Sequence, residues 1–218
     1  MTKSRVYLFD TTLRDGAQMA GVDFSLHDKL AIAALLDDLG VEYIEGGYPG
    51  ANPMDTELFA SPRKMKARWT AFGMTRRPGR SASNDPGLAQ LIDAKADAIC
   101  YVAKSWDYHV EIALQTTLEE NLASIRDSVT AAKAAGREAL VDCEHFFDGY
   151  KRNRDYALQC AKTAYDAGAR WIVLCDTNGG TLPHEVERIV RDAAAIVPGD
   201  RLGIHAHDDS GCAVGNSL

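Results

Sequence analysis

The chain has 218 residues, of which 46% are hydrophobic and 25% are charged. This length and composition exclude a disordered chain and predict one globular domain over residues 1–218. The net charge of −7 comes without a basic run, so we expect no nucleic-acid partner. No segment has the pattern of a signal peptide or a membrane span, and we therefore expect a cytoplasmic protein with no membrane partner.

Short apolar runs alternate with longer amphipathic stretches along the chain, a pattern typical of βα units around a parallel sheet. The runs lack polar alternation, as expected for strands that are buried on both faces. Seven strands are predicted, at residues 6–10, 43–48, 69–74, 98–102, 139–143, 171–175 and 202–205.

The stretches between these runs carry helix signals. The first, SLHDKLAIAALLDDLG, begins with Ser25 as its N-cap and Asp28 as the partner in a capping box, and it ends at Gly40. Two later helices are predicted to end at Gly136 and Gly168 in the same way.

Parallel strands with helical connections leave two architectures, an open doubly wound sheet and a closed barrel. The turn after the first strand reads DTTLRDG and lacks the GxGxxG pattern of a dinucleotide-binding fold. The number of units favours an α/β fold of the (β/α)8 TIM-barrel type. Only about seven units are present, so we expect an incomplete barrel without strand 8 and a C-terminal region, with unpaired edges on strands 1 and 7.

Five cysteines occur without any CxxC pair, and most lie in apolar segments. An odd set in this setting predicts reduced, buried thiols and neither disulfides nor metal ligands.

The active site of a parallel barrel lies at the carboxyl ends of its strands, so polar residues at those positions are the candidates. His205 and His207 are spaced i, i+2, which directs both imidazoles to one side of a strand. Asp15 is the best carboxylate to complete a facial set around a divalent ion. The histidine spacing alone is weak evidence, and a pair without any ligand role is about as common.

Arg14 stands next to the candidate metal ligand Asp15. It could stabilise the oxyanion that forms when a metal-polarised carbonyl is attacked, which suits carbonyl-addition chemistry. The alternative is a local ion pair between Arg14 and Asp15 that closes the loop after strand 1.

Glu45, Glu144 and Asp176 each end an apolar strand, where an unpaired carboxylate is costly. Each is therefore expected to be functional, for example as a base, or part of a hydrogen-bond network in the barrel mouth. Thr177 and Asn178 follow strand 6 and could orient a substrate or simply begin a turn.

Five motifs carry a family resemblance: LFDTTLRDGAQ, YIEGGYPGANP, DCEHFFDGYK, LCDTNGG and HAHDDSGCAVGNSL. They span nearly the whole chain and resemble the metal-dependent superfamily of 2-isopropylmalate synthase, homocitrate synthase, citramalate synthase and hydroxymethylglutaryl-CoA lyase. The residues of the second and third motifs are most similar to those of the citramalate synthases.

The resemblance implies a site around Mn²⁺, Mg²⁺ or Zn²⁺. It implies that Arg14 is catalytic and that Asp15, His205 and His207 are the metal ligands. It also implies that Glu144 and Thr177 contact a 2-oxo acid, with Glu144 as a second catalytic residue. Glu45 and Asn178 complete the expected substrate-binding set.

The activity implied is an acyl transfer from acetyl-CoA, the co-substrate, to pyruvate, giving citramalate for isoleucine biosynthesis. Alternatives within the superfamily are 2-isopropylmalate or homocitrate synthesis and the lyase reaction, although the lyase cysteine belongs to a loop after strand 8. An alternative of another class is an inactive metal-binding fragment. Relatives of full length are commonly homodimers.

Two departures from the family pattern qualify these expectations. A further asparagine ligand and a glycine-rich loop normally follow strand 8, and we expect full activity to require that segment. The usual His-Asn-Asp reads His207-Asp208-Asp209, which is expected to put an extra carboxylate near the ion.

Overall fold

Seven parallel strands form one curled sheet in the computed structural model, which describes residues 5–218 of the predicted domain. The strand order follows the sequence from β1 to β7. The strands are β1 (Phe9–Asp10), β2 (Tyr43–Gly47), β3 (Arg68–Met74), β4 (Ala98–Lys104), β5 (Glu138–Glu144), β6 (Trp171–Asp176) and β7 (Leu202–Ala206). The seven predicted strands are thereby confirmed.

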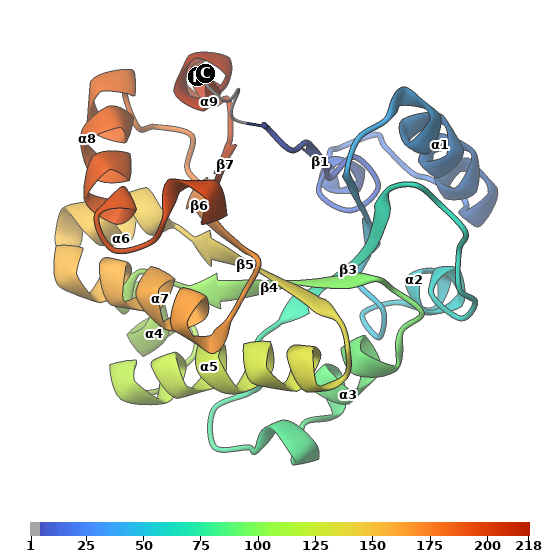
Figure 1. Cartoon of the computed structure of the whole chain (residues 1–218), viewed down its shortest axis with the longest axis horizontal. Helices are drawn as coiled ribbons and strands as arrows, with labels where there is room; N and C mark the ends of the chain where they lie inside the picture. Colours follow the sequence, from blue (N-terminus) through green and yellow to red (C-terminus); the bar gives the residue numbers. More distant parts are fainter. Residues whose placement is uncertain (1–4) are drawn as a thin grey trace.

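Helices cover the outer face of this sheet (Figure 1). They are α1 (Leu26–Leu39), α2 (Pro53–Leu58), α3 (Pro86–Asp93), α4 (Asp107–Ile112), α5 (Leu118–Ala134), α6 (Phe146–Arg152), α7 (Arg154–Ala167), α8 (Pro183–Ala194) and α9 (Ala213–Ser217). Among residues 5–218, no helix combines the length and the apolar character that a membrane span requires.

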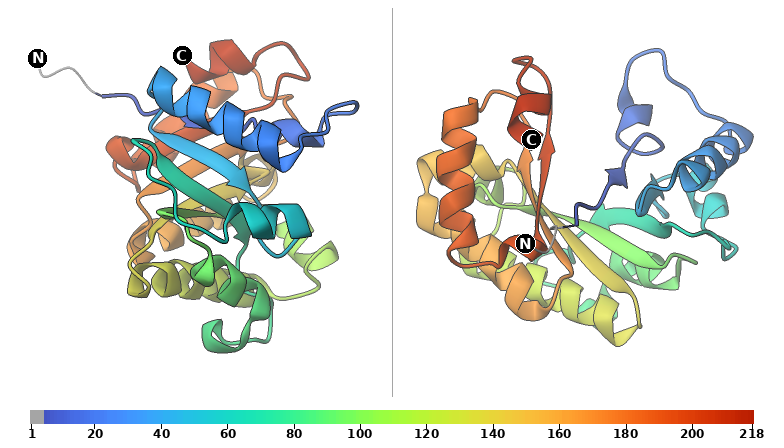
Figure 2. Two further views of the ribbon diagram at one scale, coloured as in Figure 1. Left: turned by 90° about the vertical axis from the view of Figure 1, so that its right-hand side faces the viewer. Right: turned by 45° about the horizontal axis from the view of Figure 1, so that its top comes forward.

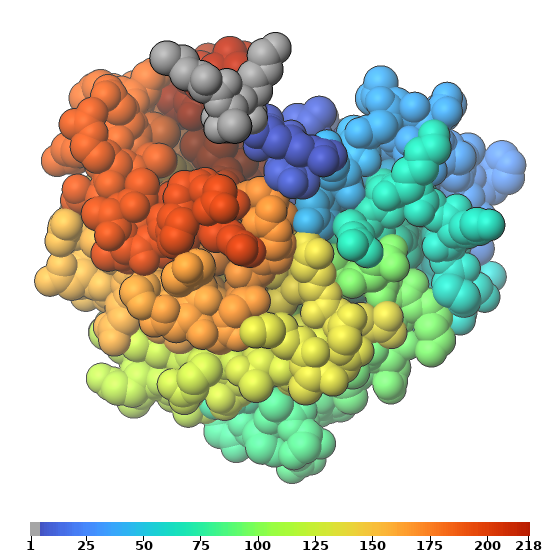
Figure 3. Space-filling view, in the orientation of Figure 1, coloured from blue at the N-terminus to red at the C-terminus, as the bar shows by residue number. Residues whose placement is uncertain are grey.

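The sheet follows the course of a TIM barrel but is open on one side. β1 is hydrogen-bonded to β2 and β7 to β6, and the two strands are not paired with each other. Figure 2 shows the opening between them, and the space-filling view shows successive segments following one another around the molecule (Figure 3). The expected unpaired edges of the first and last strands are therefore present.

Strand lengths differ from the prediction mainly at two places. β1 is shorter than residues 6–10, because its ladder with β2 begins at Phe9 and the Val6 side chain is 77% exposed. β4 and β5 run on to charged residues, Lys104 and Glu144, which are paired in register and also form an ion pair. Hydrophobicity alone could not predict these last residues, since the cross-strand ion pair compensates their charge.

The caps of α1 are those that the sequence predicts. The Ser25 hydroxyl accepts a hydrogen bond from the Asp28 backbone N–H at 3.2 Å, and the Asp28 carboxylate accepts one from the Ser25 N–H at 2.9 Å. Gly40 ends the helix with φ 94°, a left-handed conformation that glycine adopts without strain. These caps set the length of the helix that follows the β1 loop.

Side chains between the sheet and its helices form the core. Trp69 of β3 stacks on Phe59 at a centroid distance of 5.1 Å, and both are buried. A Cβ atom on Gly46 of β2 would overlap the Trp69 ring, so this position requires glycine. Four of the five cysteines are buried, as the sequence predicts.

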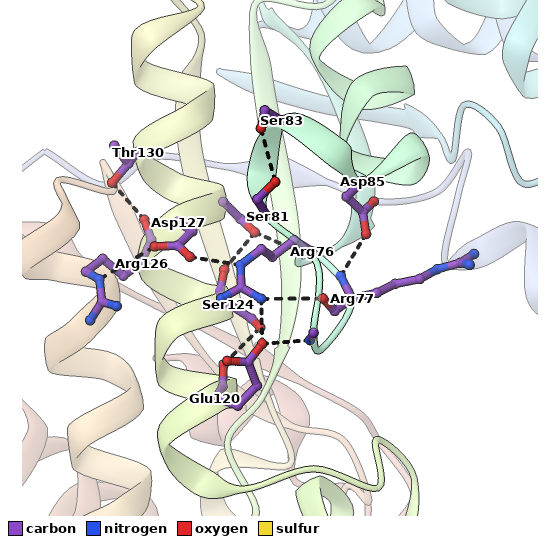
Figure 4. Close-up of polar contacts among 12 residues, drawn as sticks. Arg76, Arg77, Ser81, Ser83, Asp85, Glu120, Ser124, Arg126, Asp127 and Thr130 are labelled. Atoms are coloured by element: carbon purple, nitrogen blue, oxygen red, sulfur yellow. Dashed lines mark hydrogen bonds and ion pairs between the residues drawn. The ribbon is translucent and has the colours of Figure 1, made fainter.

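The loop after β3 is held against α5 by Arg76, whose side chain is only 5% exposed (Figure 4). Its guanidinium donates to Glu120 at 2.7 Å and to Asp127 at 2.9 Å. Its backbone N–H donates to the Ser128 hydroxyl at 2.8 Å. The network fixes one of the loops at the carboxyl end of the sheet.

Candidate metal and substrate site

The loop after β1 presents Arg14 and Asp15 toward the barrel interior. The Thr11 carbonyl accepts hydrogen bonds from the backbone N–H groups of Arg14 and Asp15, at 3.1 and 2.8 Å. Leu13, directly before them in this tight turn, is fully buried and anchors the loop in the core. A rigid turn of this kind fixes the direction of both charged side chains.

Asp15 lies beside two histidines, His205 in β7 and His207 directly after that strand. Its Oδ2 atom is 3.5 Å from His205 Nε2 and 3.7 Å from His207 Nε2. One potential ligand atom from each residue lies within 4.8 Å of the others. One carboxylate oxygen and two imidazole nitrogens form a donor set that fits a divalent metal ion, with remaining coordination positions for substrate.

The charges at this cluster stabilise one another. The hydrogen bond with His205 lowers the pKa of Asp15 to about 2, against the effect of burial and with help from Arg14. The same contact raises the pKa of His205. Asp15 is therefore ionised at neutral pH, as a metal ligand must be.

Arg14 has a fixed place between two carboxylates. It donates to Glu45 Oε2 at 2.6 Å and to Asp15 Oδ1 at 3.0 Å, and its guanidinium lies 3.8 Å from the centre of the Phe72 ring. Burial opposes its charge, but Glu45 and Asp15 raise its pKa. Arg14 therefore forms the loop-closing ion pair with Asp15, and the same side chain lies beside the candidate metal site.

Two carboxylates lie inside the barrel below this arginine. Glu45 is completely buried, and burial together with Asp142 raises its pKa to about 7, with Arg14 opposing the shift. Burial also raises the pKa of Asp142. Among residues 5–218, Glu45 Oε1 and Asp142 Oδ1 have no hydrogen-bond partner. Together with Cys100, these two residues present ligand atoms within 4.8 Å of one another.

The expected substrate-contacting residues of β5 and β6 lie farther along the same rim. Glu144 is paired with Lys104 of β4. Thr177 accepts a hydrogen bond from the His145 backbone N–H at 2.8 Å. Asn178 donates to the Asp148 carboxylate at 2.9 Å. These hydrogen bonds join the loop after β6 to the residues at the start of α6.

Two predicted features have structural roles. Both carboxylate oxygens of Asp176 accept hydrogen bonds from Thr181, at 3.0 and 2.8 Å, which favours the network reading for this residue. The Asp208 carboxylate accepts a hydrogen bond from the Ala213 N–H at the start of α9, at 2.9 Å, and it is not among the three residues of the group formed by Asp15 and the histidines. An extra carboxylate near the ion stays a prediction.

Sequence reasoning missed Asp148 and gave His145 no role. The His145 ring Nδ1 is 3.1 Å from Asp148 Oδ2 in the first turn of α6. Their spacing of i, i+3 within DCEHFFDGYK was the available signal, because such residues are neighbours on a helix surface.

Residues 5–218 match the family model described as HMGL-like. The (R)-citramalate synthases of Streptomyces coelicolor and Aquifex aeolicus are 55% and 53% identical over 97% and 98% of this chain. A 2-isopropylmalate synthase of Sulfurisphaera tokodaii is 30% identical.

The chain spans 40% and 41% of the length of those two citramalate synthases. A crystal structure of the HMG-CoA lyase of Bacillus subtilis shares the fold, with a TM-score of 0.81, 19% identity and coverage of 97% of this chain and 72% of the lyase chain. With seven βα units and a family model matched over residues 5–218, the chain belongs to the HMGL-like family.

Proposed function

We propose that this chain forms the metal- and 2-oxo-acid-binding part of a citramalate synthase, which condenses acetyl-CoA with pyruvate. The observation that carries the proposal is the Asp15, His205 and His207 cluster with Arg14 directly beside it. A divalent ion, Mn²⁺, Mg²⁺ or Zn²⁺, held there would polarise the carbonyl of the 2-oxo acid.

Arg14 stabilises the oxygen on which negative charge develops as the carbonyl is attacked. Glu45 and the Phe72 ring hold its guanidinium in place before the reaction begins, so little reorganisation is needed. Removing one preorganised donor of this kind typically lowers kcat by roughly 100- to 1,000-fold. We therefore propose Arg14 as a catalytic residue.

Glu144, Thr177 and Asn178 are proposed to orient the substrates at the opposite side of the mouth. Each is already held by a neighbour, namely Lys104, His145 and Asp148 in that order. Groups that are fixed before binding favour a single substrate pose. The Lys104 ammonium beside Glu144 also supplies positive charge for the carboxylate of a 2-oxo acid.

Pyruvate is favoured over larger 2-oxo acids by similarity, since the citramalate synthases reach 55% identity and the 2-isopropylmalate synthase 30%. One or two methylenes change discrimination by only about 1–3 kcal/mol, so a few side chains decide the choice. The second candidate function is therefore the same condensation with a branched 2-oxo acid.

The test is product analysis with Mn²⁺ and acetyl-CoA, using the protein as encoded by its gene. Pyruvate, 2-oxoisovalerate and 2-oxoglutarate are offered separately, and the products are identified by mass spectrometry. We expect citramalate from pyruvate, with a loss of at least roughly 100-fold in Arg14→Lys. Product formed from 2-oxoisovalerate and not from pyruvate would show that the branched acid is the substrate. Absence of product from all three acids would refute a synthase.

A further inference from the structure

A second set of ligand atoms lies inside the barrel, more deeply buried than the cluster of Asp15 and the two histidines. It consists of Glu45 on β2, Cys100 on β4 and Asp142 on β5, and we call it the inner cluster. One ligand atom from each residue lies within 4.8 Å of the others. All three residues are buried, so bulk water does not compete for these atoms.

Strand alternation directs the three side chains into the barrel. Tyr43, Ala98 and Leu140 form, with Cys100, a buried cluster that is separate from the core between sheet and helices. Each of the first three stands two residues before a member of the inner cluster. Because residues two apart share a face of a strand, the inner cluster forms the next layer of side chains in the barrel interior.

Two carboxylate oxygens of the inner cluster, Glu45 Oε1 and Asp142 Oδ1, are without a hydrogen-bond partner in the part of the chain that the structure describes. A buried polar atom without a partner is costly, and more so when its group is charged. Such atoms are rare in native proteins and indicate a bound ion or water.

Negative charge exceeds positive charge around these oxygens. Arg14 pairs with Glu45 through Oε2 and also with Asp15, so one guanidinium serves two carboxylates. Asp142 adds a third carboxylate, and burial together with this neighbour raises the pKa of the Cys100 thiol. A cation between the ligand atoms of the inner cluster would compensate this charge.

We propose that the inner cluster binds a Zn²⁺ ion, with one oxygen each of Glu45 and Asp142 and the sulfur of Cys100 as ligands. A point among three atoms that are at most 4.8 Å apart lies within roughly 2.8 Å of each of them. Side-chain shifts of less than about 1 Å then reach the Zn–O distance of about 2.0–2.2 Å and the Zn–S distance of about 2.3 Å.

Proton and charge balance are satisfied at this site. As the sulfur–zinc bond forms, the thiol loses its proton to solvent. Zn²⁺ with two carboxylates and a thiolate carries one negative charge, which the Arg14 guanidinium on Glu45 offsets. A water molecule completes the tetrahedral coordination.

The donor set favours zinc over other common divalent ions. Mg²⁺ and Ca²⁺ take about six or more oxygen ligands, whereas Zn²⁺ accepts a mixed set of four that includes a thiolate. Mn²⁺ binds such a set more weakly than Zn²⁺ does. We therefore expect Mn²⁺ at Asp15 and the two histidines alone, so the two sites can be distinguished.

A third group of ligand atoms connects the two sites. Asp142, Cys175 and His205 also present atoms within 4.8 Å of one another. This group shares His205 with the outer site and Asp142 with the inner cluster, and it gives an ion a path of donors into the barrel. An ion at the inner cluster holds Glu45 in place and, through Glu45, positions Arg14.

The test uses Co²⁺ as a spectroscopic substitute for Zn²⁺ in metal-free protein. Co²⁺ bound by a thiolate gives an intense charge-transfer band in the near ultraviolet, which carboxylate and imidazole ligands do not give. We expect the band in wild type and in His207→Ala, which disables the outer site. It should disappear in Cys100→Ala and persist in Cys175→Ala and in the control Cys212→Ala, a change of a half-buried thiol outside the three groups.

Displacement of Co²⁺ by Zn²⁺ measures the affinity. We expect Cys100→Ala to weaken Zn²⁺ binding in the His207→Ala background by more than about 100-fold, the upper range for losing a group that only supports a ligand. Asp142→Asn, which keeps the shape of the side chain, should weaken it by at least about tenfold.

Absence of the band in wild type would overturn the proposal before any variant is compared. A band that persists in Cys100→Ala would overturn it as well, and loss of the band in Cys175→Ala alone would assign the thiolate ligand to the connecting group instead. None of these readouts requires citramalate formation, so failure of the proposed function and failure of the inner zinc site are distinguishable.

Discussion

The buried pair of Arg14 and Glu45 predicts a large and pH-dependent cost for Arg14→Met. Glu45 is fully buried, and Arg14 Nε is its hydrogen-bond donor at 2.6 Å. Removing one partner of a buried ion pair typically lowers the free energy of unfolding by about 3–5 kcal/mol when the remaining group stays charged. If Glu45 takes up a proton instead, the cost falls to that of an unsatisfied polar group, about 1–3 kcal/mol.

The direction of the pH dependence follows from the pKa of Glu45. That pKa is about 7 with Arg14 present, above its ordinary value of 4.5, and Arg14 acts to lower it. Without the cation the folded-state pKa rises further, so the native state of the variant binds more protons than the unfolded state from about pH 4.5 upward. The stability of Arg14→Met should therefore fall as pH rises through neutrality.

Urea unfolding followed by tryptophan fluorescence at pH 5.5 and pH 8 measures this cost. Lys66→Met is the control, because Lys66 lies 3.9 Å from Asp38 and both side chains are mostly exposed. It should change stability by less than about 0.5 kcal/mol. A cost for Arg14→Met as small as that of the control, or one that is larger at pH 5.5, would refute the reasoning.

Three further stability predictions use the same unfolding assay. Gly179→Ala should lower the free energy of unfolding by about 1 kcal/mol more than Gly21→Ala. Both glycines have positive φ, but only the new Cβ at Gly179 would lie 2.5 Å from Asp209 Oδ2. Equal losses in the two variants would contradict this. Ser25→Ala should cost about 1 kcal/mol through loss of the α1 cap, and no measurable loss would contradict the capping box. Ser128→Ala should cost about 1–3 kcal/mol, since it leaves a buried backbone N–H without an acceptor; a neutral result would show that the β3 loop does not depend on it.

Periodicity and caps were sufficient to predict the sheet and the main helices. Apolar runs without alternation are informative because a parallel strand is buried on both faces, as in β4 with its fully buried Ile99 and Tyr101. The ends of β1 and β5 were less predictable. They depend on which neighbour offers a hydrogen-bonding edge or an opposite charge, and this is a tertiary property.

The cluster of Asp15, His205 and His207 was predictable because its members are marked by local spacing and by their place at strand ends. His205 and His207 lie on the same side of one strand end, and Asp15 follows the strand at the other edge of the sheet. The contact between His145 and Asp148 was not predicted, because it depends on the left-handed backbone of His145 and on the hydrogen bond from its N–H to Thr177, which follows β6. The hydrogen bond from the Ala213 N–H to Asp208 was not predicted either, because it depends on where α9 begins.

The most direct test of the central claim is calorimetric titration of metal-free protein with Mn²⁺, with and without pyruvate, in wild type and His207→Ala. His184→Ala, an exposed change on α8, is the control. The proposed site predicts that wild type and the control bind the ion, that pyruvate strengthens the binding, and that His207→Ala abolishes it. Absence of binding in wild type, or unchanged binding in His207→Ala, would contradict a metal site formed by Asp15, His205 and His207.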